Sequence, residues 1–320
     1  FSQLSIFSEL NNIKNYSLDD EFGAICGFTQ EEILSTFHEG IHEMAKANGL
    51  TTEQTVAKMK EQYDGYRFTP HCPNIYNPYS VLNALHDKKF SNYWFATGTP
   101  TFLLELLIKN DIEMPQLEGI VATEDQFDSP TDNIGNPIPV LYQSGYLTIK
   151  DYDEGIYTLG YPNEEVRMGL NRSMLNYIAP QYGLKTTAFA AQFRAAMRKD
   201  DIDTAMKVLQ SFLAAFPYDI HHNREDYFQA ILFTIFITLG FTIHAEVKTA
   251  RGRIDLLIST KTTIFVMELK IDQSAEKALE QIDAKDYALP YKHDGRRIFK
   301  VGINFSTEKR TVDEWKYEEA

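Results

Sequence analysis

Cysteine is scarce in this sequence: only Cys26 and Cys72 occur among 320 residues. Their spacing matches neither a disulfide framework nor a zinc site, and so few thiols fit a reducing compartment, so we expect a cytoplasmic protein. Long apolar runs are also lacking, because no stretch approaches the roughly 20 residues of a transmembrane helix. The composition, 43% hydrophobic and 24% charged, is that of an ordinary globular protein with no expected membrane segment.

A nucleotide-binding loop is missing as well. The pattern G-x-x-x-x-G-K-[ST], whose main-chain amides cradle phosphates, occurs nowhere in the sequence. We therefore expect no ATP chemistry within these 320 residues. Residue 1 is Phe rather than Met, and we expect the chain to begin inside a longer protein.

Positive charge is in deficit overall, since the net charge is -14. Residues 1–220 hold 16 Lys and Arg against 29 Asp and Glu, whereas residues 221–320 hold 15 against 16. An acidic surface repels a phosphate backbone, so the acidic N-terminal region is better suited to a basic protein partner than to a nucleic acid. The C-terminal third carries enough Lys and Arg to line one face, which permits contact with DNA or RNA.

The most informative stretch combines two apolar runs, Gly252–Ile258 and Ile264–Lys270, separated by small or polar residues. This pattern predicts a β-hairpin with both faces of each strand buried. With a two-residue loop, the register places Asp255 directly opposite Glu268, with Cβ atoms roughly 5 Å apart. Glu268 and Lys270 are two residues apart and therefore share one face of their strand.

Buried charges in such a hairpin need compensation. Ionised carboxylates are costly to bury unless they are paired or hold a metal, and carboxylate oxygens are the ligands that Mg²⁺ prefers. Asp255 and Glu268 therefore predict a divalent metal site beside Lys270, an arrangement suited to phosphodiester cleavage. The structural alternative is an edge-strand Asp beside a solvated Glu-x-Lys, and the triplet alone does not decide between them.

The neighbouring sequence favours the functional interpretation. A capped, amphipathic helix is predicted over Ser274–Ala288, with Gln281 and Lys285 on one flank. Alternating apolar residues predict a strand over Arg297–Ser306. Upstream, an apolar helix over 225–239 precedes a strand over 241–247. The predicted order of elements is helix, three strands, helix and strand.

Five motifs lie along these elements: E-V-K-T-A-R-G-R-I-D at 246–255, E-L-K at 268–270, S-A-E-K-A-L-E-Q-I at 274–282, K-D-Y at 285–287 and G-I-N-F-S at 302–306. With the element order, they resemble the PD-(D/E)XK nuclease superfamily, and in particular the nuclease-like domain that follows an AAA-ATPase-like domain in many bacterial proteins. The resemblance implies a restriction-endonuclease-like α-β-β-β-α-β domain at 216–320, within an α/β (α+β) multi-domain chain.

The resemblance also implies roles for particular residues. Asp255 and Glu268 would bind Mg²⁺ or Mn²⁺ together with the Leu269 carbonyl, and Lys270 would orient the attacking water or offset charge in the transition state. Gln281 would contact the scissile phosphate, unless its helix is simply amphipathic.

A third metal ligand is expected before these residues in the chain. Glu225, at the start of the apolar helix, would supply it, and Glu246 on the following strand competes for that role. The alternative for Glu225 is a solvated acid favoured by the dipole of its helix.

The front of the chain is predicted to be mainly helical. A capping box of Thr29 and Glu32 opens a helix to about Ala47. The motif order F-S-E-L-N-N, Y-D-G-Y, N-P-Y-S and Y-W resembles the helical C-terminal part of the AAA-ATPase-like domain, at residues 1–110. ATP would then bind only upstream of these residues. Residues 111–215 are predicted to be a helical linker with a β-hairpin around 153–155, either a spacer or a winged-helix-like element.

The leading functional interpretation is a metal-dependent hydrolase that cleaves DNA or RNA, coupled to an ATPase in the intact protein. The second is a catalytically silent nuclease fold that binds nucleic acid or protein. The third is a partner module whose acidic N-terminal region docks a basic protein. The residue pattern chooses neither DNA over RNA nor endonuclease over exonuclease.

Overall fold

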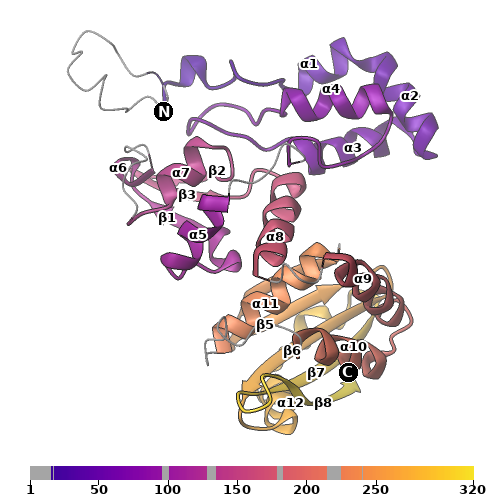
Figure 1. The fold of residues 1–320 in the computed structure, drawn as a ribbon. Coiled ribbons are helices and arrows are strands. Elements are labelled where there is room, and N and C mark those ends of the chain that lie inside the picture. The colour runs from indigo at the N-terminus through magenta and orange to yellow at the C-terminus, as the bar shows by residue number, and fades with distance from the viewer. Residues whose placement is uncertain are drawn as a thin grey trace. The chain divides into compact units, whose positions relative to one another are not determined.

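The computed structural model describes residues 16, 18–95, 101–127, 135–178, 183–214, 225–239 and 241–320. The chain forms two compact units, Phe1–Leu170 and Asn171–Ala320, and Figure 1 labels their helices and strands. Within the described ranges, every helix is too short or too polar to cross a membrane. The architecture is mixed α+β, with helices in the N-terminal and middle parts and a C-terminal sheet, as predicted.

The first unit begins with a helical bundle around a core that includes Ile33, Met59 and Tyr76. Thr29 and Glu32 form the predicted capping box, each side chain accepting a hydrogen bond from the other residue's amide. A cap of this kind contributes about 0.5–2 kcal/mol to stability. The bundle consists of α1 (Gln30–Thr36), α2 (His38–Asn48), α3 (Thr52–Tyr63) and α4 (Pro78–Asp87), preceded by η2 (Asp20–Phe22).

The prediction of one continuous helix from Thr29 to about Ala47 is wrong. The chain leaves helical geometry at Phe37 (φ -111°, ψ 19°), which separates α1 from α2. The ring of Phe37 packs edge-on against Phe28, with centroids 5.3 Å apart, and both rings lie against the bundle core. The helix is therefore interrupted at the residue whose partly buried ring packs against the bundle core.

A small sheet follows the bundle in the first unit. The predicted hairpin is present, and its turn residues Glu154 (φ 46°) and Gly155 (φ 91°) have the left-handed conformation that tight hairpins require. A third strand, β1, pairs with β3 and was not predicted. The elements are α5 (Thr101–Lys109), η4 (Met114–Leu117), β1 (Ile120–Ala122), α6 (Glu124–Phe127), α7 (Ile138–Gln143), β2 (Thr148–Asp153), β3 (Ile156–Gly160) and α8 (Glu164–Ile178), which continues past Leu170 into the second unit.

Glu165 is a buried carboxylate of the first unit. Glu165, only 1% exposed, accepts hydrogen bonds from the Ser80 hydroxyl (2.6 Å) and the Trp94 amide (2.7 Å). Burial raises the pKa of Glu165, and these hydrogen bonds lower it by a smaller amount. The carboxylate thus links α4 to α8 at an electrostatic cost.

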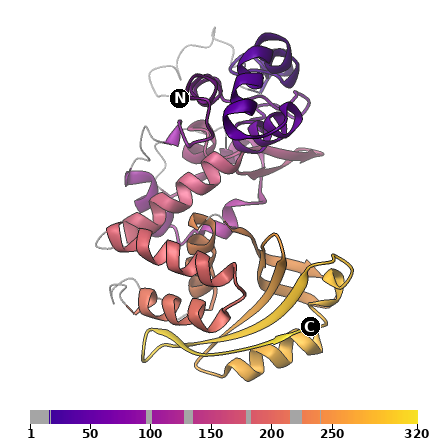
Figure 2. The same cartoon turned by 90° about the vertical axis from the view of Figure 1, so that its right-hand side faces the viewer.

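The second unit contains a five-stranded sheet with helices packed against it. Strand order is β4-β5-β6-β7-β8, and only β6 and β7 run parallel, joined through α12. Figure 2 shows α12 lying along the sheet. The elements are α9 (Gly183–Met197), α10 (Ile202–Leu213), α11 (Glu225–Thr238), β4 (Thr242–Thr249), β5 (Gly252–Ser259), β6 (Thr263–Ile271), α12 (Ala275–Ala284), η7 (Leu289–Tyr291), β7 (Arg297–Ser306) and β8 (Thr311–Glu319).

The predicted register of the β5–β6 hairpin is confirmed. Pairs run from Ser259–Ile264 to Leu256–Met267, and Thr260 donates its amide to the Thr263 carbonyl at 2.8 Å across the turn. One step beyond the last pair, the same register places Asp255 opposite Glu268.

The hydrophobic core beneath α12 holds that helix against the sheet. Leu279 and Ile282 of α12 pack with Val266 of β6 and Ile298 of β7, and full burial of such a side chain contributes about 1.5–3 kcal/mol. The close approach requires glycine at position 302, because a Cβ there would lie 2.3 Å from the Ala275 carbonyl oxygen. The helix is therefore closely seated over β6 and β7.

The last strand, β8, was not predicted from the sequence. It pairs with β7 and also contacts α10, where Gln210 donates to the Val312 carbonyl (2.7 Å) and the Thr311 hydroxyl donates to the Gln210 carbonyl (2.9 Å). Helices α9 and α10 thus belong to the same compact unit as the sheet. The predicted domain limits at residues 110 and 215 stay a prediction.

Candidate functional site

Two charged side chains lie close together at the end of β6. Glu268 is 1% exposed, and the side chain of Lys270 is 12% exposed. The Lys270 ammonium donates to Glu268 Oε1 at 3.1 Å and to the Leu269 carbonyl oxygen at 2.9 Å. The two side chains share one face of the strand, as predicted, and form a buried ion pair.

Helix α12 contributes Gln281 to the same carboxylate. The Ser274 hydroxyl accepts a hydrogen bond from the Lys277 amide and caps the helix as predicted. The apolar stripe of α12 packs on the sheet, and this orientation lets Gln281 Nε2 donate to Glu268 Oε1. The Glu268 carboxylate is therefore oriented by one neutral donor and one cationic donor.

Asp255 meets the same segment from β5. The main-chain pairing of β5 and β6 ends at Leu256–Met267, and the Leu269 amide donates instead to Asp255 Oδ2 at 2.8 Å. Asp255 is half-buried. The site thus forms where the ladder ends and a carboxylate takes the place of a main-chain acceptor.

The oxygen atoms in this arrangement suit a divalent cation. Two carboxylates and the Leu269 carbonyl are hard donors of the kind that Mg²⁺ and Mn²⁺ bind. The Lys270 ammonium already contacts two of these oxygens, so the position attracts positive charge. Among the described residues no group of three or more His, Cys, Asp and Glu side chains could hold a metal.

The predicted third ligand is not tested by the structure. Glu225 is the first residue of α11, and its side chain lies outside the described part of the chain. The side chain of Glu246 lies outside it as well. The register of β4 and β5, with Val247 opposite Ile254 and Ala245 opposite Leu256, places the backbone of residue 246 opposite Asp255. Both roles stay predictions.

A set of contacts beside the site, between the start of β5 and the segment that follows α12, was not predicted from the sequence. The Tyr287 hydroxyl accepts a hydrogen bond from the Arg253 amide at 3.1 Å, and Arg251 forms an ion pair with Asp286. A Cβ at position 252 would lie 2.6 Å from the Tyr287 hydroxyl, so glycine is needed there. The G-R-I-D and K-D-Y motifs were both visible in the sequence, but nothing in their spacing indicated this contact.

The comparison with protein families agrees with this geometry. Residues 223–315 match the family model of the PD-(D/E)XK nuclease superfamily. The matched range contains all of the predicted site residues, from Glu225 to Gln281. These residues form a PD-(D/E)XK nuclease superfamily domain, as the sequence resemblance implied. Nucleases of this superfamily generally use divalent metal ions such as Mg²⁺.

A curated protein is similar over nearly the whole chain. This relative, from Azotobacter chroococcum mcd 1, is described as an "Uncharacterized protein in vnfD 5'region" and is 29% identical over 323 residues. The alignment covers 98% of the present chain but 60% of the relative. The chain thus spans about three fifths of the length of the relative that it matches.

Proposed function

We propose that residues 216–320 hydrolyse phosphodiester bonds of DNA or RNA with Mg²⁺ or Mn²⁺. The observation that carries this proposal is the buried Glu268 carboxylate, which Lys270 and Gln281 contact within the matched superfamily domain. A carboxylate at 1% exposure is costly to desolvate, and a catalytic metal site gives a reason for placing it there. Asp255 supplies the second carboxylate.

The metal would be held by Asp255, Glu268 and the Leu269 carbonyl, with Glu225 proposed as an additional ligand. A bound divalent ion polarises a phosphate oxygen and lowers the pKa of a bound water. Gln281 holds the Glu268 carboxylate in orientation through its amide donor. Asp255 is held in turn by the Leu269 amide, so both carboxylates are positioned before substrate binds.

Lys270 would supply positive charge to the reaction. Its ammonium would leave the Glu268 and Leu269 oxygens and contact the phosphate or the attacking water. Water attacks phosphorus and releases one proton to solvent, the opposite P–O ester bond breaks, and the departing oxygen takes a proton from solvent or a bound water. Charge that develops on the phosphoryl oxygens is stabilised by the nearby ammonium.

The test is cleavage of labelled duplex and single-stranded DNA and RNA by the purified chain, with Mg²⁺, Mn²⁺ or EDTA. We expect metal-dependent cleavage that Asp255→Asn, Glu268→Gln and Lys270→Ala each reduce by at least about 100-fold, or about 2.7 kcal/mol in the barrier. Lys261→Ala is the control, because Lys261 is an exposed residue of the β5–β6 turn, at the end of the hairpin away from Asp255 and Glu268. Metal binding and nucleic-acid binding without cleavage by the wild type would favour the silent binding module instead.

We also propose that residues 1–110 correspond to the helical C-terminal part of an AAA-ATPase-like domain, that residues 111–215 link it to the nuclease-like domain, and that the acidic front binds a basic protein. The order of the aromatic motifs and the charge distribution support this assignment. Binding of ATP to the chain tighter than about 100 µM, or roughly -5.5 kcal/mol, would contradict it.

A further inference from the structure

Two groups of basic residues in the second unit differ in whether carboxylates neutralise their charge. One group is neutralised by carboxylates of β7, β8 and their neighbours, so little of its charge is left for a ligand. Its members are Arg296 (with Asp294), Arg297 (with Asp200 and Glu319), Lys300 (with Asp283 and Glu318), Lys309 (with Asp313) and Lys316 (with Glu276).

The other group lies near the candidate site. Lys248, Lys285 and Lys292 are exposed, and none of the three enters an ion pair with a described residue. Asp286, the carboxylate beside Lys285, is already paired with Arg251. The charge of these lysines is therefore available to an anionic ligand.

Several contacts bring these lysines to one end of the unit. Lys248 pairs with Arg253 across β4 and β5, and the Arg253 amide donates to the Tyr287 hydroxyl. Lys285 follows α12 directly as its C-cap, two residues before Tyr287.

Lys292 joins them through the hydrophobic core. Val247 and Tyr291 both pack against the core cluster that contains Ile254 and Tyr287. Lys248 follows Val247 in the chain, and Lys292 follows Tyr291. Lys248 and Lys292 thus each follow a residue that packs on this cluster, and Lys285 lies two residues before its member Tyr287.

The same segments carry the site residues. Arg253 lies two positions before Asp255 on β5, a step of about 7 Å along a strand. Lys285 lies four positions after Gln281, about one helical turn. A polymer chain held by these lysines would therefore pass close to Asp255 and Gln281.

We propose that Lys248, Lys285 and Lys292 bind the phosphates that flank the scissile phosphodiester, so that the nucleic-acid backbone crosses the β4–β5 turn and the segment after α12. The inference rests on the proposed function. Lysines that contact phosphates release condensed counterions, which makes affinity depend steeply on salt.

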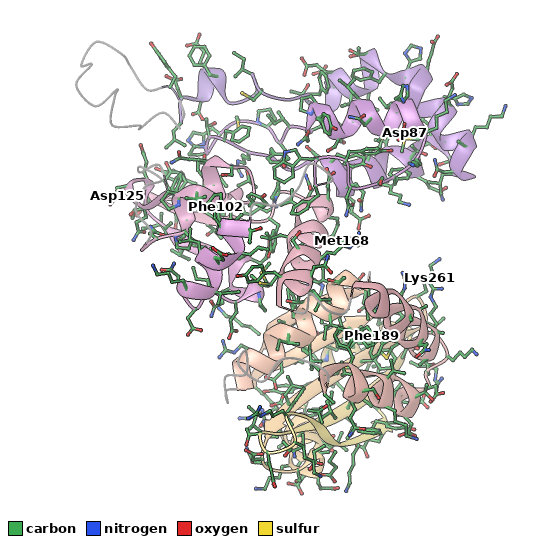
Figure 3. The ribbon with its side chains drawn as sticks, in the orientation of Figure 1. Asp87, Phe102, Asp125, Met168, Phe189 and Lys261 are labelled. Carbon is green, nitrogen blue, oxygen red and sulfur yellow. The ribbon has the colours of Figure 1, made fainter. Side chains whose placement is uncertain are left out.

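The test compares two triple charge reversals in the full chain. Lys248→Glu, Lys285→Glu and Lys292→Glu form the site triple, and Lys199→Glu, Lys207→Glu and Lys261→Glu form the control triple. The control lysines are exposed residues of the same unit, and Figure 3 shows Lys261 at the end of the unit away from α12. Both triples change the net charge equally, so a general charge effect would act on both.

Binding is measured by fluorescence anisotropy in EDTA with labelled 20-nucleotide duplex DNA, single-stranded DNA and RNA over a range of salt. We expect the site triple to weaken binding of the preferred nucleic acid by about tenfold to 100-fold. The negative slope of log K against log[salt] should become smaller in magnitude by about 2–3. The control triple should change affinity less than about threefold. Equal weakening by both triples, or no weakening by the site triple, overturns the inference.

Two further measurements separate this inference from the proposed function. Hydrolysis of bis(4-nitrophenyl) phosphate needs no flanking phosphate, so the site triple should retain it at the wild-type rate, and circular dichroism should show unchanged folding. A site triple that hydrolyses this substrate yet binds nucleic acid like the wild type overturns only the phosphate path. A wild type that hydrolyses neither substrate overturns the proposed function, while the anisotropy comparison still decides whether these lysines hold the backbone.

Discussion

Replacing Lys270 with alanine should destabilise the second unit, and a bound divalent metal should restore most of the lost stability. The substitution leaves the carboxylate of Glu268, 1% exposed, without its ammonium partner. Removing one member of a buried pair costs about 3–5 kcal/mol, because the remaining charge is desolvated without compensation. A metal ion bound at the same oxygens restores positive charge, and at 100 times its Kd it stabilises the folded state by about 2.7 kcal/mol.

The measurement uses the intrinsic fluorescence of Trp315. The chain has two tryptophans, and the other, Trp94, lies in the first unit. In a Trp94→Phe background, urea titration therefore follows unfolding of the second unit alone. We expect Lys270→Ala to lower the midpoint in EDTA and Mn²⁺ to recover most of the loss.

A double-mutant cycle supplies the control for this prediction. Glu268→Gln removes the buried charge, so Lys270→Ala added to Glu268→Gln should cost at least 2 kcal/mol less than Lys270→Ala alone, a coupling within the range of about 0.5–3 kcal/mol for residues in contact. The double variant should also lose the response to Mn²⁺. A single Lys270→Ala variant that unfolds within about 0.5 kcal/mol of wild type, the level of an ordinary surface substitution, would refute the buried pair.

Three further predictions concern other parts of the chain. Gln281→Ala should lower stability by about 1.5–3 kcal/mol, the value of a hydrogen bond to a charged group, and reduce cleavage, whereas a variant with unchanged urea midpoint and rate would remove Gln281 from the site. A fragment of residues 171–320 should unfold cooperatively in urea. A fragment of residues 216–320, which lacks α9 and α10, should also fold but have a lower urea midpoint of unfolding. Equal midpoints of the two fragments by circular dichroism would contradict the packing of α10 on β8. Burial raises the pKa of Glu165, so its contribution to stability is present below the unfolded pKa and lost as pH rises through the folded pKa. In urea titrations that follow Trp94 fluorescence, Glu165→Gln should flatten this pH dependence of stability. An unchanged pH profile in the variant would contradict the prediction.

The β5–β6 hairpin could be predicted because its information is local. Two apolar runs and a short turn determine a register, and the register alone brings Asp255 to Glu268. The flank of α12 that carries Gln281 follows from helical periodicity in a similar way. The hydrogen bond from Gln281 to Glu268 was not predicted, because the sequence suggested only a contact with the scissile phosphate, which stays a prediction.

Features that depend on distant partners could not be predicted in this way. Strand β8 is rich in charged residues and has no clear alternation, and it forms because β7 and α10 supply its partners. The contact of Tyr287 with Arg253 joins residues 34 positions apart, with no spacing rule to indicate it. The division of basic residues into paired and available groups likewise depends on which carboxylates tertiary folding places nearby.

Leu269 occupies the position that the Glu-x-Lys pattern leaves unspecified. Through its contacts, the geometry of the candidate site depends on the folded sheet. Its amide holds Asp255, its carbonyl accepts from Lys270, and its side chain is fully buried in the sheet. Asp255, Glu268 and Lys270 all lie on strands β5 and β6, so none of these three belongs to a loop that could loosen before the sheet unfolds. On heating, activity should persist until the sheet itself unfolds and then disappear over the same few degrees, so thermal inactivation would report global unfolding of the second unit rather than local fraying.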